Sequence, residues 1–274
     1  MKSIYSLYEG ILGDIETRIA SDNDVHEVII DEIKQFLNDH YLAHRGSKFK
    51  ISKRPNKNGM YEVTCNSHVT ATQSKHKLKT ITNGKFVFKE VKGWFDVTLC
   101  HDLESLEGCP EFVGDNFKCA CCENLKSLKG CPIHVGGDFD CSGCHVLESL
   151  EGSPVTVKGA FICSACNSLK SLEGCPEHVG SFKMGLCREI ETLKYAPKTV
   201  DHDFLCYKCR SLKSLKGCTN FIPGRFDCSR CESLHSIEYC PEYVGENFEC
   251  YSCGKKFSKS DITNKCEVKG SIKY

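Results

Sequence analysis

Phenylalanine recurs along this chain at an almost constant interval of 22 residues, with one step of 21 between Phe161 and Phe182. The series comprises Phe95, Phe117, Phe139, Phe161, Phe182, Phe204, Phe226 and Phe248. A fixed period in this range is typical of a solenoid, in which each repeat forms one coil and stacks on its neighbours. This periodicity constrains the fold much more tightly than it constrains the function.

Each repeat contains a short alternating segment followed by a bend. In the repeat that begins at Phe117, Cys119 comes two residues later and Cys122 a further three residues on. Residues two apart in a β-strand point to the same side, so Phe117 and Cys119 are expected to point inward. The chain must bend just before Cys122 to bring that side chain inward as well. Leucines and a proline turn complete the coil, so we expect turns and 3₁₀ segments on the return path.

This pattern resembles the leucine-rich repeat, in which the inward strand positions are followed by an Asn or Cys at the bend. Phe117 and Cys119 match the inward positions, and Cys122 matches the bend position. The resemblance covers residues 95–257 and is closest to short Cys-rich repeats in proteins of tailed phages and gut bacteria. It implies a right-handed solenoid of about eight coils with parallel strands. It brings no known activity.

The 22 cysteines fall mainly into three columns of the repeat. Six C-x-x-C pairs begin at Cys119, Cys141, Cys163, Cys206, Cys228 and Cys250, and two such pairs can build a zinc site. In other repeats, however, Val97 and Met184 take the first position of the pair. Ser153 and Ala196 similarly take the position of the third cysteine, which precedes the proline turn. Val and Ala cannot bind a metal, so we predict buried columns of free thiols and no metal or other cofactor, with zinc and disulfides as alternatives.

Cys121 differs from the other cysteines because it falls on the exposed step between Cys119 and Cys122. It is the best candidate for a reactive thiol, and the alternative is a solvent-facing bystander. Residues 1–20 contain Glu9 and Asp14 where a secretory signal needs an uninterrupted apolar run. We therefore expect a cytoplasmic protein with reduced thiols, located in the host cytoplasm if a phage encodes it.

Outside the repeats, three further regions are predicted. Apolar residues at helical spacing in 4–20 and 24–41 predict a helical hairpin over residues 1–44, either a cap or a docking and dimerising pair. Residues 48–65 predict a β-hairpin within a basic entry region, 45–92. The solenoid spans 93–257, and residues 258–274, which lose the repeat frame, are expected to cap its last coil. The predicted fold class is therefore α+β, a leucine-rich-repeat β-solenoid preceded by a helical hairpin and a small β-hairpin.

Charge is unevenly distributed along the chain. Residues 45–92 hold 12 basic and 2 acidic side chains, whereas residues 1–44 hold 3 basic and 9 acidic side chains. A dense positive patch can bind phosphates or another polyanion, and the alternative is a solvated lysine face that pairs with the acidic helices. The candidate polyanion-binding residues are Lys48, Lys50, Lys53, Arg54, Lys57, Lys75, Lys77 and Lys79.

The outward-facing residues of the repeat strands form the candidate protein-binding surface, since solenoids use this face as one extended contact area. The residue directly after each phenylalanine belongs to a first outer row. The residue two positions further along the chain belongs to a second outer row. Tyr and Arg carry most of the energy at interfaces, and both are enriched in the C-terminal half of these rows. Small residues such as Ser142, Ser164 and Gly185 would let another backbone approach. The candidate partner-binding residues are Tyr207, Lys208, Arg210, Arg225, Arg230, Tyr251, Ile162 and Leu205.

No arrangement typical of a catalytic site is evident. His134 and His178 share one position of the repeat, which Thr156 and other uncharged residues also fill. Thiols in apolar columns have raised pKa values and react slowly. The sequence therefore predicts a non-enzymatic, non-membrane protein that binds another protein, with polyanion binding and a zinc-loaded structural role as alternatives. The phage resemblance implies a product that inhibits or modulates a host defence protein.

Overall fold

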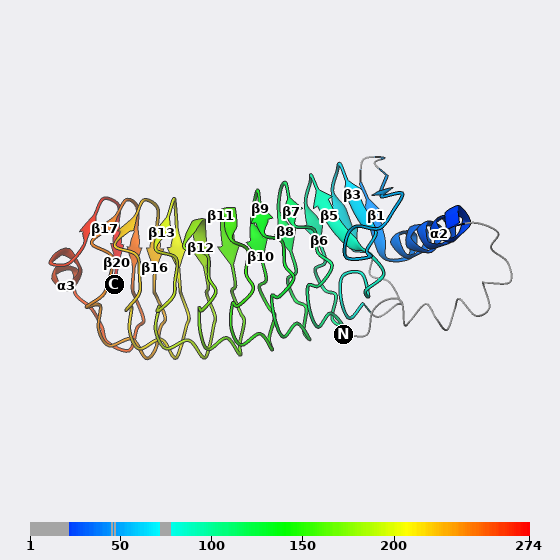
Figure 1. Ribbon diagram of the computed structural model, residues 1–274. Helices are drawn as coiled ribbons and strands as arrows, with labels where there is room; N and C mark the ends of the chain where they lie inside the picture. Colours follow the sequence, from blue (N-terminus) through cyan, green and yellow to red (C-terminus); the bar gives the residue numbers. More distant parts are fainter. Residues whose placement is uncertain (1–21, 45, 47, 72–77) are drawn as a thin grey trace.

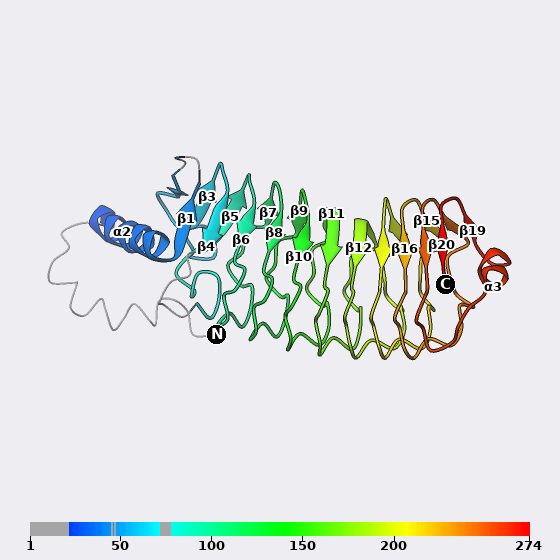
Figure 2. The same ribbon diagram turned by 180° about the vertical axis from the view of Figure 1, so that it is seen from behind.

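The computed structural model describes residues 22–44, 46, 48–71 and 78–274. These residues form a parallel β-solenoid of about nine turns, with a helix at the N-terminal end and little helix elsewhere (Figure 1). Strands gather along one long side, and the return loops run along the opposite side, as the view from behind also shows (Figure 2). The first predicted helix, 4–20, lies outside the described residues.

Two helices and twenty strands are described. The helices are α2 (Asp22–His40) and α3 (Lys259–Thr263). The strands at the N-terminal end are β1 (Tyr41–Ala43), β2 (Lys50–Ile51), β3 (Glu62–Cys65), β4 (Val69–Ala71) and β5 (Val87–Val91). The following strands are β6 (Phe95–Asp96), β7 (Phe112–Val113), β8 (Phe117–Lys118), β9 (His134–Val135), β10 (Phe139–Asp140), β11 (Thr156–Ile162), β12 (His178–Lys183), β13 (Thr199–Val200) and β14 (Phe204–Leu205). The last are β15 (Phe221–Ile222), β16 (Phe226–Asp227), β17 (Tyr243–Val244), β18 (Phe248–Glu249), β19 (Glu267–Val268) and β20 (Ile272–Lys273).

Each regular coil contributes to two parallel stacks of strands. In the valine stack, Val113 of β7 pairs with Val135 of β9. In the phenylalanine stack, Phe117 of β8 pairs with Phe139 of β10. The single 21-residue step arises between these stacks, because Val179 lies only three residues before Phe182, whereas the other coils have four. Both β11 and β12 run continuously through the two stacks, and the missing residue of β12 appears as a register shift in their pairing.

The predicted bend before the second cysteine is confirmed by the backbone. Cys121 has a positive φ of 55°, and Leu99, Gly143, Ala165, Leu186, Lys208, Arg230 and Ser252 adopt the same left-handed conformation at equivalent positions. This bend turns Cys122 back into the interior, where it is buried. The return path consists of turns, and it contains no 3₁₀ helix within the residues that the structure describes, contrary to the expectation of such segments.

The interior is built from columns of identical side chains. Neighbouring phenylalanine rings lie 5.0 to 6.3 Å apart along the stack from Phe95 to Phe248. Cys141 and Cys163 are fully buried, and all 22 cysteines are free thiols. The predicted burial is therefore confirmed for the first column and for most of the second, whereas Cys131, Cys175 and Cys218 of the third column are only half-buried.

The second cysteine column also forms a ladder of hydrogen bonds. The Cys166 thiol donates to the Cys141 carbonyl of the preceding coil over 3.3 Å. The same bond to the preceding coil is made by Cys122, Cys144, Cys187, Cys209, Cys231 and Cys253, over 3.1 to 3.3 Å. Each acceptor belongs to the residue that occupies the first column, whether that residue is Cys, Val97 or Met184. The second column thus links successive coils through its thiol donors. The first column contributes only backbone carbonyls to these bonds, so its side chain need not be a cysteine.

The N-terminal end of the solenoid is covered. β1 pairs antiparallel with β4, and β2 pairs antiparallel with β3, which gives the predicted β-hairpin. Helix α2 buries Ile33, Phe36 and Leu37, and the Phe36 ring lies 5.7 Å from that of Phe86 in an edge-on contact. None of the helices in the described ranges is both long enough and apolar enough to cross a membrane.

The C-terminal segment forms a further coil. Val268 pairs with Val244 and Ile272 pairs with Phe248, each 24 residues after its partner. Ser258 and Asp261 form a capping box that starts α3, the helix lying between β18 and β19. The expectation that residues 258–274 lose the repeat frame is therefore wrong, because both strand positions are resumed after the helix.

Candidate functional site

The outer face of the phenylalanine stack changes character along the solenoid. Its first outer row is half-buried from Asp96 to Lys183 and is then buried at Leu205, Asp227 and Glu249, which are 5 to 7 % exposed. The expectation that Leu205 is exposed is not met, so its side chain offers little area to a partner. The C-terminal coils therefore hold two buried carboxylates on a face that sequence alternation alone assigns to solvent.

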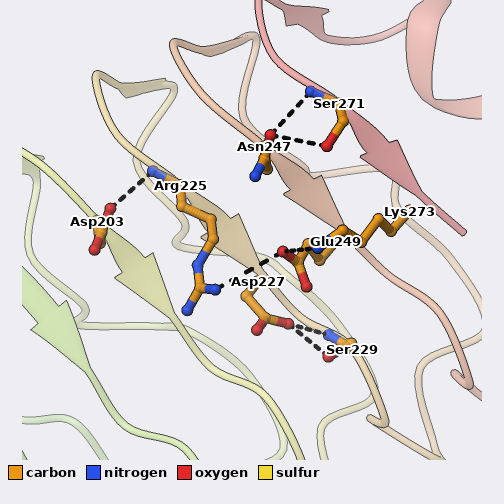
Figure 3. Close-up of polar contacts among 8 residues, drawn as sticks. All are labelled: Asp203, Arg225, Asp227, Ser229, Asn247, Glu249, Ser271 and Lys273. Carbon is orange, nitrogen blue, oxygen red and sulfur yellow. Dashed lines mark hydrogen bonds and ion pairs between the residues drawn. The ribbon is translucent and has the colours of Figure 1, made fainter.

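The buried Glu249 carboxylate lies between two cations. Its Oε1 atom is 3.0 Å from Lys273 Nζ of the following coil and 3.8 Å from Arg225 Nη1 of the preceding coil. Figure 3 shows the three side chains meeting across β16, β18 and β20. A buried carboxylate is stable only when it is paired, so the two cations explain how Glu249 is accommodated. The contact also places the Arg225 guanidinium beside Glu249.

The neighbouring carboxylate, Asp227, is held by its own strand end. Its Oδ1 atom accepts hydrogen bonds from the Ser229 backbone N–H over 2.9 Å and from the Ser229 hydroxyl over 2.6 Å (Figure 3). Asp96 and Asp140 accept the corresponding backbone N–H in earlier coils. Asp227 therefore has a structural role at the bend and is not free to bind a ligand.

Arg225 interrupts a second ladder of side-chain hydrogen bonds. The residue before each phenylalanine normally accepts the backbone N–H of its counterpart one coil later. Asp203, for example, accepts the Arg225 N–H over 2.9 Å, and Asn247 accepts the Ser271 N–H over 2.9 Å. Asn116, Asp138 and Ser181 do the same in earlier coils. Neither Ala160 in an earlier coil nor Arg225 can accept this hydrogen bond, so the ladder is interrupted at both, and only Arg225 places a cation on the face.

Tyr207 packs on the glycine of the preceding coil. A Cβ atom on Gly185 would lie 2.6 Å from the Tyr207 ring, so only glycine leaves room for it. The expectation that Gly185 leaves space for another backbone is wrong, because the tyrosine ring occupies that space. Tyr207 is consequently packed against the preceding coil and remains half-exposed.

Two further arginines reach from one coil to the next. Arg230 lies over the Tyr251 ring at 5.6 Å from its centroid, and Arg210 Nε lies 3.2 Å from Glu232 Oε1. Arg230 and Lys208 both occupy the left-handed bend position. Lys208 has no carboxylate within ion-pair distance in the described part of the chain. The contacts of Arg230 and Arg210 restrict their side chains before any partner binds.

The structure brings most of the predicted partner-binding residues together. Tyr207, Lys208, Arg225, Arg230 and Tyr251 lie on three consecutive coils, those of β14, β16 and β18. Two other candidates, Ile162 and Arg210, are more distant. Ile162 is half-buried two coils before Leu205 in the ladder, and Arg210 lies beyond the bend. Lys273, Asp203 and Asn247 also belong to this region but are absent from the predicted set. The four-residue spacing from Val268 to Ile272, which matches that from Val244 to Phe248, is the signal that would have revealed Lys273.

The basic region is only partly gathered. Lys48, Lys50, Lys53 and Lys57 are exposed and have no carboxylate within ion-pair distance among the described residues. Lys48 also lines a cavity of about 600 Å³ between α2 and β2. Lys79 lies 3.6 Å from Glu104, Arg54 is engaged in a contact, and Lys75 and Lys77 lie outside the described residues.

Burial limits the reactivity of most thiols, whereas hydrogen bonding with Cys119 lowers the pKa of Cys144 and hydrogen bonding with Cys228 lowers the pKa of Cys253. Cys121 is the one exposed cysteine, but partial burial, with smaller effects from Cys144 and Asp140, raises the pKa of its thiol. Burial raises the pKa of Cys231 and of Cys250 to about 12, which keeps both as thiols at neutral pH. Within the described residues, no three His, Cys, Asp or Glu side chains are grouped so that they could hold a metal ion.

Comparisons with known proteins provide no family assignment. No protein-family model, curated protein or solved structure matches this chain.

Proposed function

We propose that this chain is a non-enzymatic protein-binding module that takes its partner on the face formed by Tyr207, Lys208, Arg225, Arg230 and Tyr251. The observation that carries the proposal is the arrangement of the two tyrosines and two of the cations. Tyr207 is fixed on Gly185, Arg230 lies over Tyr251, and Arg225 is held by Glu249. Side chains that are ordered before binding lose less entropy on association, and Tyr and Arg are the strongest contributors to interfaces.

The charge of this face favours a partner with an acidic contact surface. Lys208 and Arg230 carry positive charge at the bend and are not neutralised by a carboxylate within the described residues. Leu186 occupies the same bend position one coil earlier and adds an exposed apolar side chain. An acidic surface with an apolar centre would complement this set.

The finer identity of the module is part of the same proposal. The Cys ladder at the bend and the parallel strands support a leucine-rich-repeat solenoid, for which a right-handed winding is expected. We also propose a cytoplasmic location and, from the resemblance to phage repeats, a product that modulates a host protein. The 22 free thiols support a reducing compartment.

Replacing Tyr207 and Arg230 together with alanine is expected to weaken binding of the partner by about 100-fold, because each is placed as an interface anchor. The melting temperature should fall by no more than a few degrees, since both side chains are at the surface. The matched control replaces Tyr239 and Lys216, an exposed tyrosine and a cation on the return side, and should bind normally. Titration calorimetry and thermal unfolding measure the two effects; equal binding by both variants would place the interface elsewhere.

A second candidate function is supported by the exposed lysines of the N-terminal hairpin. Lys48, Lys50, Lys53 and Lys57 extend from β2 to the hairpin turn, and a patch of this kind binds nucleic acid or another polyanion through phosphate contacts. Changing Lys48, Lys50, Lys53 and Arg54 to Glu should abolish salt-dependent retention on heparin and DNA columns. The control changes four exposed lysines of the return side, Lys129, Lys170, Lys213 and Lys216; equal loss in this control would indicate a non-specific charge effect.

A further inference from the structure

The third cysteine column, which precedes the proline turn, brings thiols of successive coils together at two places. Cys109 and Cys131 form one neighbouring pair, and Cys218, Cys240 and Cys266 form a run of three. The remaining cysteine of the column stands between coils that carry serine or alanine at this position. Within this column, only these two places offer thiols on adjacent coils that could bond to each other.

Cys218 and Cys240 lie in register on two coils that are hydrogen-bonded to each other. The backbone N–H of each closes the same turn with the carbonyl three residues earlier, over 2.9 and 3.1 Å. Two residues after each cysteine, the Glu242 N–H donates to the Asn220 carbonyl of the preceding coil over 2.9 Å. Coils joined in this way lie about 4.8 Å apart, within the Cα separation of about 4.4–6.8 Å that a disulfide needs. The register therefore places the two thiols within reach of each other.

The same two thiols line a cavity of about 410 Å³ between the coils. The rest of the lining comprises Gly217, Asn220, Glu238, Tyr239, Glu242 and Lys265. Tyr239 and Lys265 stand where glycine precedes Cys218, so larger side chains replace glycine in the last two coils. Cys218 is half-buried, whereas first-column thiols such as Cys206 are fully buried. A small molecule in the cavity can therefore contact this pair.

Lys265 distinguishes the two thiols of the pair. Burial raises the pKa of the Cys240 thiol to about 11, and the Lys265 ammonium acts in the opposite direction. Burial, with a smaller effect from Cys240, raises the pKa of Cys218 well above its ordinary value. The thiolate is the nucleophile in thiol–disulfide exchange, so Cys240 is the thiol that reacts first.

We infer that Cys218 and Cys240 form a thiol pair that a low-molecular-weight disulfide oxidises reversibly through this cavity. The Cys240 thiolate attacks one sulfur of the small disulfide, which forms a mixed disulfide and releases one small thiolate. The Cys218 thiolate then attacks the Cys240 sulfur, which forms the Cys218–Cys240 bond and releases the second small thiolate. Each released thiolate takes up the proton that a protein thiol has lost. Two protein thiols are thus oxidised while one small disulfide is reduced to two thiols.

The bond would join two successive coils covalently, directly before β15 and β17. It would form when the small-disulfide concentration rises and break again when small thiols are in excess. The inference does not depend on the proposed function, because the pair lies on a different part of each coil from Tyr207 and Arg230.

The test exposes the whole protein to glutathione disulfide, then alkylates the remaining thiols and maps the peptides by mass spectrometry. We expect the Cys218–Cys240 bond to form about tenfold faster than a Cys109–Cys131 bond, and excess reduced glutathione to restore the thiols. Cys109 and Cys131 are the matched control because they share the register. In the coil after Cys131, however, Gly152 stands where Lys265 follows Cys240, and the Cys131 thiol donates to the Gly152 carbonyl over 2.8 Å.

Variants separate the two steps of the exchange. Cys218→Ser should retain a glutathione mixed disulfide at Cys240, because the second thiol is absent, whereas Cys240→Ser should form neither product. Both variants should fold, since Ser153 already occupies this column in another coil. Lys265→Met should slow the exchange and move its pH–rate profile to higher pH, because the cation no longer favours the Cys240 thiolate.

Four outcomes would overturn the inference. Equal rates for Cys218–Cys240 and Cys109–Cys131 would mean that the column spacing alone decides, and modification confined to Cys121 would mean that exposure alone decides. A Cys240–Cys266 bond would place the pair one coil later, and the absence of any disulfide would leave both thiols inert. If a variant fails to fold, the peptide map of the unmodified protein decides the question, because it identifies the bonded pair directly.

Discussion

Replacing Cys166 with valine is expected to destabilise the protein much more than replacing Cys163 with valine. The Cys166 thiol donates to the buried Cys141 carbonyl, and valine cannot replace this donor. The carbonyl would then face a methyl group, at a cost of about 1–3 kcal/mol, with a similar cost for the extra volume. Cys163 lies in the first column, where Val97 already occupies the equivalent position of another coil.

Serine at the same two positions should reverse the order. In Cys166→Ser the new hydroxyl can donate to the same carbonyl, so this variant should be well tolerated. Cys163→Ser would place a hydroxyl among the apolar side chains of the first column, at a cost of about 1–3 kcal/mol. Urea unfolding of the four variants measures the effects. Equal losses in the two columns, for both valine and serine, would show that the thiol hydrogen bonds contribute nothing to stability.

The substitution Gly174→Ala is expected to have the second large effect, a loss of about 3 kcal/mol or more from overpacking and backbone strain. Gly174 has a φ of +92°, and an added Cβ atom would lie 2.3 Å from the Leu150 carbonyl oxygen and 2.5 Å from its carbon. The obstruction is backbone of the preceding coil, so a side-chain rotation cannot relieve it. Tyr195 takes this position one coil later with a φ of 68°, which shows that relief requires the backbone itself to move.

Gly84→Ala provides the matched control for Gly174→Ala. Gly84 has a φ of +75° but no atom within 4 Å of an added Cβ, so this variant measures the left-handed strain alone, about 1–2 kcal/mol. Thermal and urea unfolding of the two variants should therefore differ clearly. If the two variants lost the same stability, close packing between successive coils would not be the reason that residue 174 is glycine.

The repeat period predicts the solenoid, the inward phenylalanines and the bend because each depends on local spacing alone. The period did not reveal that residues 258–274 return to the frame, since the two extra residues of that coil and helix α3 hide the match. The spacing from Val268 to Ile272 survives because it is set by the distance between the two strand stacks. The spacing between the two strand positions within a coil therefore identifies the last coil better than the period from one coil to the next.

The burial of residues on the candidate face could not be predicted from the sequence. Alternation places Asp227 and Glu249 outward, and they do lie on the outer side, yet both are buried. Glu249 is contacted by long side chains of the neighbouring coils, Arg225 and Lys273, which reach over the strands. Likewise the ring of Tyr207 fills the space that Gly185 leaves. Side-chain directions of this kind follow from three-dimensional packing and cannot be read from a period.

The thiol ladder has a direction that bears on how the chain is made. Every bond between coils that the second column makes runs from a later residue to a carbonyl of the coil before it, as from Cys187 to Cys163. During synthesis, a coil leaving the ribosome therefore meets an acceptor that has already emerged. Each new turn can dock on finished structure, which favours vectorial folding from the end that α2 covers.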